Sequence, residues 1–198
     1  MLGQAWFADR VWTFDYPGQR LLLWPDSAAV MPADPAHAVA LGFRTDTTGT
    51  RVLSFPRLRV EIDGDSIDLL FDTGATANIP AAALEKLADG LPAERATSFI
   101  TSSVLNRWRE RHPDWRVIDE ADETVPAMVM IEVPSLSIAG FDAGPVWFTE
   151  RPDRNFHEYM SSFMDRRVEG ALGGSGLKYF RITVDYPRAM AWFERPDR

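Results

Sequence analysis

The amino-acid sequence predicts a mainly β fold with a few short helices. Residues 57–72 alternate apolar and polar side chains on both sides of Asp63-Gly64, which is a strong hairpin signal. Residues 125–149 contain apolar runs separated by proline and glycine, and this pattern indicates two or three strands. A further hairpin is predicted near the end of the chain, where "RITVDY" (181–186) faces "AMAWF" (189–193).

Three short segments have the spacing of helices. Residues 80–89 begin with a proline and are followed by a glycine, residues 97–111 repeat large apolar side chains every four residues, and residues 155–164 predict a short third helix. The acidic stretch "DEADE" (119–123) is interpreted as a solvated loop, since runs of like charge are usually exposed.

The composition is that of an ordinary globular protein. The chain has 198 residues, of which 45% are hydrophobic and 25% charged, and its net charge of −8 argues against a nucleic-acid partner. It has no apolar run of about 18 residues, so no membrane-spanning segment is expected. The opening "MLGQAWFADRVW" lacks the layout of a signal peptide. As written, the chain is therefore expected in the cytoplasm, and a periplasmic or secreted location stays open if the N-terminus is truncated.

The sequence offers few metal ligands. It has no cysteine, which excludes disulfides, thiolate metal sites and thiol nucleophiles. The three histidines, His37, His112 and His157, lie far apart and match no known spacing of metal ligands. Neither a metal nor a cofactor is expected.

The two ends of the chain resemble each other. Residues 2–23, "LGQAWFADRVWTFDYPGQRLLL", align without gaps on residues 172–193, "LGGSGLKYFRITVDYPRAMAWF". The identical pairs are Leu2/Leu172, Gly3/Gly173, Thr13/Thr183, Asp15/Asp185, Tyr16/Tyr186 and Pro17/Pro187. This repeat predicts a shared supersecondary unit. We interpret residues 1–24 as the closing hairpin of an otherwise missing first lobe, residues 25–37 as a linker and residues 38–198 as a complete lobe.

The stretch "SIDLLFDTGATANIP" (66–80) places an acid, Asp72, at the end of an apolar strand. The small Thr73 and the glycine Gly74 follow it and permit a tight turn, which would present the carboxylate at the floor of a cleft. An aspartate also caps turns routinely, so a purely structural role for Asp72 is the alternative. A similar stretch, "TDTTGT" (45–50), follows no apolar strand, and its Asp46 is interpreted as part of a polar turn.

Two motifs together resemble the retropepsin-like aspartic proteases. They are "LLFDTGATANI" (69–79) and, about 100 residues later, "VEGALGGSGLKYFRITVDYPRAMAWF" (168–193), and the match covers residues 38–198 in order and spacing. The resemblance implies a closed, barrel-like acid-protease lobe. It also implies that Asp72 is catalytic and that the active-site loop is shaped and supported by Thr73, Gly74, Ala75, Ala171, Leu172 and Gly173.

The mechanism implied by this resemblance needs two aspartates. Side by side, two carboxylates cannot both ionise, so they share a proton: one accepts a proton from the attacking water, and the other protonates the carbonyl oxygen of the peptide. This chain has one Asp-Thr-Gly triplet. The second aspartate is therefore expected from another lobe, if the chain is a fragment of a longer protein, or from a second copy of the chain. The substrate is expected to be a polypeptide.

Two other functions remain open from the residues alone. One is a catalytically silent module of the same fold that binds an extended peptide or scaffolds a complex. The other is a β domain in which Asp72 is only structural. The leading hypothesis is an aspartic endopeptidase.

Overall fold

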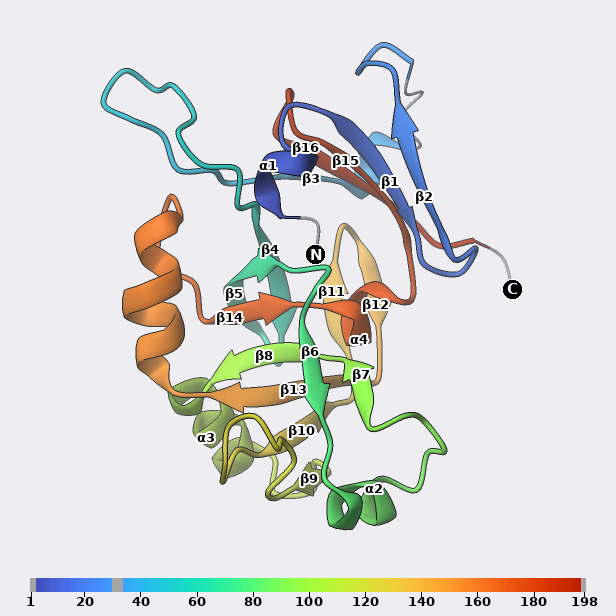
Figure 1. Ribbon diagram of the computed structural model, residues 1–198, viewed down its shortest axis with the longest axis vertical. Helices are drawn as coiled ribbons and strands as arrows, with labels where there is room; N and C mark the ends of the chain where they lie inside the picture. The colour runs from blue at the N-terminus through green and yellow to red at the C-terminus, as the bar shows by residue number, and fades with distance from the viewer. Residues whose placement is uncertain (1–2, 30–33, 197–198) are drawn as a thin grey trace.

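The computed structural model describes residues 3–29 and 34–196, and most of its regular structure is β. Its main sheet has nine strands in the order β12-β11-β4-β5-β14-β8-β13-β10-β9 (Figure 1). These strands are β4 (Arg57–Ile62), β5 (Asp65–Phe71), β8 (Ser98–Thr101), β9 (Val117–Ile118), β10 (Met130–Val133), β11 (Leu136–Ile138), β12 (Phe141–Ala143), β13 (Val146–Arg151) and β14 (Gly170–Leu172). The mainly β prediction is confirmed.

A second sheet joins the two ends of the chain. Its order is β2-β1-β15-β16-β3, with β1 (Val11–Asp15), β2 (Arg20–Trp24), β3 (Ala38–Ala40), β15 (Arg181–Asp185) and β16 (Met190–Glu194). In Figure 1 the two hairpins, blue and red, lie together above the main sheet. The antiparallel pairing of β1 with β15 packs the first hairpin against the rest of the chain.

The hairpin predicted for residues 57–72 is confirmed. Strands β4 and β5 pair in antiparallel register from Arg57↔Leu70 to Ile62↔Asp65, and Asp63 and Gly64 form the turn between them with positive φ angles. In β4, the alternating side chains Leu58, Val60 and Ile62 are buried, as the period of two requires. Strand β5 then runs directly into Asp72.

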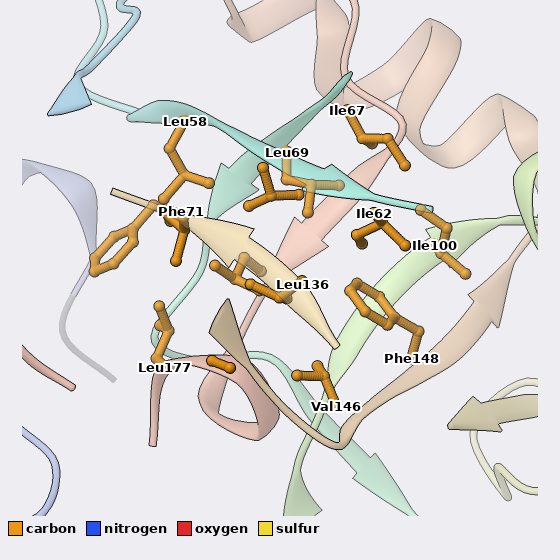
Figure 2. Packing of buried hydrophobic residues seen from close by; sticks show 14 of the residues in the cluster. Leu58, Ile62, Ile67, Leu69, Phe71, Ile100, Leu136, Val146, Phe148 and Leu177 are labelled. Carbon is orange, nitrogen blue, oxygen red and sulfur yellow. The ribbon is translucent and has the colours of Figure 1, made fainter. Parts of the chain in front are cut away.

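The main hydrophobic core contains buried side chains from both the main sheet and the hairpin sheet. Figure 2 shows side chains from several strands converging, among them Leu58 and Leu69 of the β4–β5 hairpin and Phe148 of β13. Leu177, from the short helix α4 (Gly174–Leu177), closes the cluster on one side. Trp12 and Phe14 of β1 belong to this same core, so the N-terminal hairpin is built into the fold.

The predicted helices are present with changed bounds. Helix α2 (Ala81–Leu87) ends at a left-handed Ala88, before the glycine predicted as its stop. The helix predicted over 97–111 is partly wrong, because residues 98–101 form β8 and helix α3 (Ser102–Arg111) begins only afterwards. The periodic apolar side chain at Ile100 is buried in a strand, where pairing with β13 and β14 overrides the helical spacing. The predicted short helix near 155–164 is a π-helix (Asn155–Tyr159) and a 3-10 helix (Met160–Phe163).

Two other predictions need correction. Residues 125–149 contribute to four strands, β10 to β13, rather than two or three, because Pro134, Gly140 and Gly144 separate very short strands. The closed barrel is also not formed: among the described residues, the outermost strands β12 and β9 do not pair with each other.

The remaining strands, β6 (Thr76–Asn78) and β7 (Glu94–Ala96), form a separate two-stranded sheet.

The acidic stretch 119–123 is not uniformly solvated, contrary to the sequence-based interpretation. Asp122 is buried, and its carboxylate accepts a 2.6 Å hydrogen bond from the guanidinium of Arg151 and another from the Thr124 N–H. The partner lies 29 residues away in the sequence, so a local charge pattern could not reveal it.

Replacing Asp122 with alanine is expected to lower the free energy of unfolding by about 3 kcal/mol, because it leaves the Arg151 charge unpaired in a largely buried site. The exposed neighbour Glu123 is the matched control, and Glu123→Ala is expected to change stability by less than about 0.5 kcal/mol. Urea unfolding of the two variants measures both effects. Equal urea midpoints for Asp122→Ala and Glu123→Ala would contradict a stabilising role for the buried Asp122–Arg151 pair.

Candidate active site

Asp72 and Gly173 follow two neighbouring parallel strands. Strands β5 and β14 pair with Leu172 opposite Phe71, so the residues after each strand emerge at the same edge of the sheet. The backbone N–H of Asp72 donates to the carbonyl of Leu172 at 3.0 Å. The structure therefore brings together the two sequence motifs that lie about 100 residues apart.

The loop after β5 holds the Asp72 carboxylate with a backbone group. The N–H of Gly74 donates to Oδ1 of Asp72 at 2.9 Å, and the N–H of Ala75 contacts the Asp72 carbonyl at 3.4 Å. Thr73, predicted to help hold the acid, is exposed, and the described residues show no hydrogen bond between its hydroxyl and Asp72.

Gly74 does not have the conformation that the sequence suggested. The sequence analysis assigns Gly74 to a tight turn, where a glycine is required if φ is positive, but Gly74 is not among the described glycines with positive φ. A Cβ placed on Gly74 would lie 3.5 Å from Oδ1 of Asp72, an ordinary contact. Gly74→Ala is therefore expected to fold with near-parental stability, which a thermal melt can check.

Gly173 is the glycine that close packing requires. A Cβ on this residue would lie 2.0 Å from the Thr97 carbonyl oxygen, 2.6 Å from the Ala75 methyl and 3.2 Å from the Asp72 carbonyl oxygen. Its N–H donates to the hydroxyl of Ser98, which is also hydrogen-bonded to Ser175. These buried contacts fix the floor beneath the Asp72 loop, together with the fully buried Ala171 and Leu172.

Sequence reasoning missed the polar part of this floor. Thr97 and Ser98 lie in the segment that we assigned to a helix. In the structure Ser98 begins β8 and its hydroxyl accepts a hydrogen bond from the Gly173 N–H, while the N–H of Thr97 donates to the Ala75 carbonyl. The burial of these two hydroxyls depends on the distant partners Thr149 and Gly173, so no local pattern in the sequence reveals it.

A pocket of about 390 Å³ opens over Asp72. It is formed jointly by the Asp72 loop, the N-terminal segment and the final turn, and the sequence did not predict the last two contributions. Its lining includes Asp72, Thr73, Gly74, Gly3, Gln4, Phe7, Phe14, Met160 and Tyr186. The carboxylate thus faces a hollow that the two halves of the sequence repeat help to build.

Burial raises the pKa of the Asp72 carboxyl above its usual value of 3.8, and the hydrogen bond from the Gly74 N–H partly offsets this rise. The folded chain therefore binds more protons than the unfolded chain between pH 3.8 and the raised pKa. Over this window the stability of the parent falls as the pH rises.

Asp72→Asn removes the buried charge and is expected to raise the melting temperature at neutral pH. Because the parent carboxyl is neutral below pH 3.8, the difference between parent and variant should disappear there. Thermal melts across this range measure the effect. A variant that is less stable at neutral pH would contradict the assignment of Asp72 to a desolvated site.

The sequence repeat is also a structural repeat, with Leu2 outside the described residues. Helix α1 (Gln4–Phe7) and helix α4 occupy equivalent positions, and the β1–β2 hairpin matches the β15–β16 hairpin. Thr13 and Thr183, 170 residues apart, are directly opposite each other, and their hydroxyls share a 2.7 Å hydrogen bond. An approximate two-fold axis therefore passes between these two residues, perpendicular to the sheet.

The turns of the two hairpins are equivalent in detail. Asp15 accepts a hydrogen bond from the N–H of Gly18 at 2.9 Å, and Asp185 accepts one from the N–H of Arg188 at the same distance. Gln19 and Ala189 occupy matching positions with φ angles of 51° and 54°. The Asp-Tyr-Pro sequence thus encodes the same turn twice.

Other features have no link to this site. Asp46 caps a polar turn by accepting hydrogen bonds from Thr48 and Thr50, as predicted. Within residues 3–29 and 34–196, no group of three or more acidic or histidine side chains could hold a metal ion, and no helix has the length and apolarity needed to cross a membrane.

No protein-family model matches this chain, and no curated protein matches it.

Proposed function

We propose that this protein is a lobe of an aspartic endopeptidase of the retropepsin-like type. In this proposal Asp72 is one of two catalytic carboxylates, and the second comes from an equivalent lobe across the approximate two-fold axis. Ala171, Leu172 and Gly173 are the support beneath the Asp72 loop, as the resemblance implies.

The observation that carries the proposal is the position of Gly3 in the Asp72 pocket. Gly173 lies beside Asp72, and Gly3 is its equivalent in the repeat. By the same symmetry, an aspartate of a second lobe would lie beside Gly3. Because Gly3 and Asp72 line the same pocket of about 390 Å³, two such carboxylates would meet in it.

An extended polypeptide is the substrate that fits the surroundings of Asp72. Thr73 also lines a second pocket of about 340 Å³ together with Tyr16, and Tyr16 in turn lines a third of about 560 Å³. The third pocket is largely apolar, with Leu91, Met130 and Trp147 on its walls. Neighbouring pockets that share lining residues suit successive side chains of an extended peptide.

The environment of Asp72 suits the acid–base role. Burial raises its pKa, and the hydrogen bond from the Gly74 N–H opposes the rise. A second carboxylate at close range would keep one proton shared by the pair, so that one group accepts a proton from water and the other donates to the carbonyl oxygen. The alanine at position 75 supplies no hydroxyl to stabilise the charged form, which favours a higher working pH than a serine at this position would give.

The chain of 198 residues can be tested directly for this activity. Hydrolysis of an unfolded protein substrate is measured over a range of chain concentrations, together with the solution mass. The rate of hydrolysis is expected to be proportional to the fraction of chains that form a dimer. It is expected to be lost in Asp72→Asn and to be blocked by a pepstatin-type transition-state mimic. Hydrolysis by the monomer, or hydrolysis that survives Asp72→Asn, would contradict the proposal. A dimer with both copies of Asp72 in one pocket that binds peptides without cleaving them would favour the alternative, a catalytically silent peptide-binding module.

A further inference from the structure

Two residues connect the Asp72 pocket with the pocket beside it, and a third residue connects that pocket with the next. The pocket of about 390 Å³ over Asp72 and the adjacent pocket of about 340 Å³ are both lined by Phe14 and Thr73. Tyr16 is the one described residue that lines both the 340 Å³ pocket and the apolar pocket of about 560 Å³. It therefore lies at the junction between the Asp72 loop and the pocket that contains Trp147.

The backbone around Tyr16 is held by paired strands and a capped turn. Strand β1, which ends at Asp15, pairs with β2 on one side and with β15 on the other. The buried carboxylate of Asp15 accepts a 2.6 Å hydrogen bond from the Arg20 guanidinium and a 2.9 Å bond from the Gly18 N–H. The N–H of Gln19 donates to the Tyr16 carbonyl at 3.1 Å. A side chain on a backbone held in this way has a defined position, which a group that orients a ligand needs.

The hydroxyl of Tyr16 has no structural role in the part of the chain that the structure describes. The side chain is partly buried and packs against the main hydrophobic core, but its hydroxyl forms no hydrogen bond with any described residue. The hydroxyl of Tyr179, by contrast, donates to the Pro145 carbonyl at 2.7 Å. Because polar groups withdrawn from water are normally paired, the Tyr16 hydroxyl points to a partner that arrives with a ligand.

The Tyr16 hydroxyl also lies within electrostatic reach of Asp72. Burial raises the pKa of this phenol well above its usual value of 10.0, and the negative charge of Asp72 raises the pKa further. The equivalent residue of the repeat, Tyr186, has a different charged neighbour: burial raises its pKa to about 12, and the Arg51 guanidinium opposes this rise. Tyr16 therefore keeps its proton over the pH range in which Asp72 titrates, so its hydroxyl is a hydrogen-bond donor there.

We propose that Tyr16 is a substrate-binding residue of the Asp72 site, and that its hydroxyl donates a hydrogen bond to a backbone carbonyl of a bound, extended polypeptide. This carbonyl belongs to a peptide group beside the one that is cleaved, because Tyr16 lines the pockets next to the Asp72 pocket rather than that pocket itself. The identity of the ligand, a polypeptide, rests on the proposed function. The unpaired hydroxyl and its place between the pockets do not.

In this role Tyr16 exchanges no proton with the substrate. A hydrogen bond to a carbonyl away from the reacting atoms has the same strength in the bound substrate and in the transition state. It therefore lowers KM and leaves kcat nearly unchanged. This separates the role of Tyr16 from that of Asp72, whose removal abolishes kcat in the proposed mechanism.

The test compares two substitutions that each remove one hydroxyl and keep the ring. Tyr16→Phe removes the proposed donor. Tyr159→Phe is the matched control, since Tyr159 is 66% exposed and does not line the three pockets. Both variants are expected to melt within about 2 °C of the parent. Each substitution is combined with Asp72→Asn, so that bound polypeptide is not cleaved, and binding of a fluorescently labelled unfolded protein is measured by anisotropy.

Tyr16→Phe is expected to weaken this binding about tenfold or more, because the peptide carbonyl loses its donor, and Tyr159→Phe is expected to leave it unchanged. When the tyrosine rings are isotopically labelled, the NMR signals of Tyr16 should shift on addition of the unfolded protein, while those of Tyr159 should not. Equal affinities of the two variants would overturn the proposal. Absence of binding by the chain that carries Asp72→Asn alone would overturn it as well.

Hydrolysis gives a separate result. In a form that cleaves the unfolded protein, Tyr16→Phe should raise KM by about the factor by which it weakens binding, and a loss of kcat at constant KM would contradict the proposed contact. Weaker binding by Tyr16→Phe, together with no hydrolysis by the parent, would support the Tyr16 contact and reject the proposed endopeptidase.

Discussion

Gly173→Ala is expected to lower the free energy of unfolding by about 4 kcal/mol or more, because the new methyl would lie 2.0 Å from the Thr97 carbonyl oxygen. That oxygen belongs to a backbone that pairs with Ala75 and cannot move without distorting the Asp72 loop. For a chain of this size the melting temperature would fall by roughly 8 to 16 °C. Differential scanning calorimetry measures the shift.

The repeat supplies the control for this substitution. Gly3 has nearly the same extended backbone as Gly173, but a Cβ on Gly3 would contact nothing described within 4 Å. Gly3→Ala should therefore leave the melting temperature within about 2 °C of the parent. Equal effects of the two substitutions would show that the floor beneath Asp72 is not packed as described.

Trp12→Ala is expected to cost about 4 kcal/mol, since it removes a large side chain from the central core. Trp12 is 3% exposed, stacks on Trp6 with ring centroids 4.3 Å apart and donates a hydrogen bond to the Phe7 carbonyl. This cost is expected because the first hairpin is an integral part of the fold.

Leu23→Ser is the matched control for Trp12→Ala, as it replaces an exposed side chain of the neighbouring strand. It should leave stability within about 0.5 kcal/mol of the parent. Chemical unfolding distinguishes the two variants. A Trp12→Ala protein as stable as the Leu23→Ser protein would mean that residues 3–24 are only loosely attached to the rest of the fold.

The sequence predicts the elements with strong local patterns. The alternation in 58–62, the Asp63-Gly64 turn and the repeated Asp-Tyr-Pro turn each depend on neighbouring residues, so their structures follow from local rules. The link between Asp72 and Leu172 could be anticipated only because two motifs together resemble a known family.

The sequence could not reveal features that depend on distant partners. Residues 98–101 have helical spacing, but they form strand β8 because they pair with β13 and β14. The burial of Asp122 depends on Arg151. The strict need for glycine lies at Gly173 rather than at Gly74 because the carbonyl of Thr97, between β7 and β8, approaches Gly173. The pocket over Asp72 likewise includes Gly3 from the opposite end of the chain.

Peptide hydrolysis by a two-lobed protein tests most directly the claim that Asp72 is one half of a catalytic pair. In this protein residues 38–172 are joined directly to Gly3 of the full chain, and Gln4→Gly, Ala5→Ser and Trp6→Gly give α1 the small residues of α4. It has two copies of Asp72 and is expected to cleave an unfolded protein substrate. Asp72→Asn in either copy alone should reduce the rate by about 10⁴-fold or more, because neither carboxylate can act without the other. A rate that is unchanged when both copies carry Asp72→Asn would contradict the claim. So would the absence of hydrolysis by a two-lobed protein whose lobes are shown to be packed together by slow hydrogen exchange at the amides of β2.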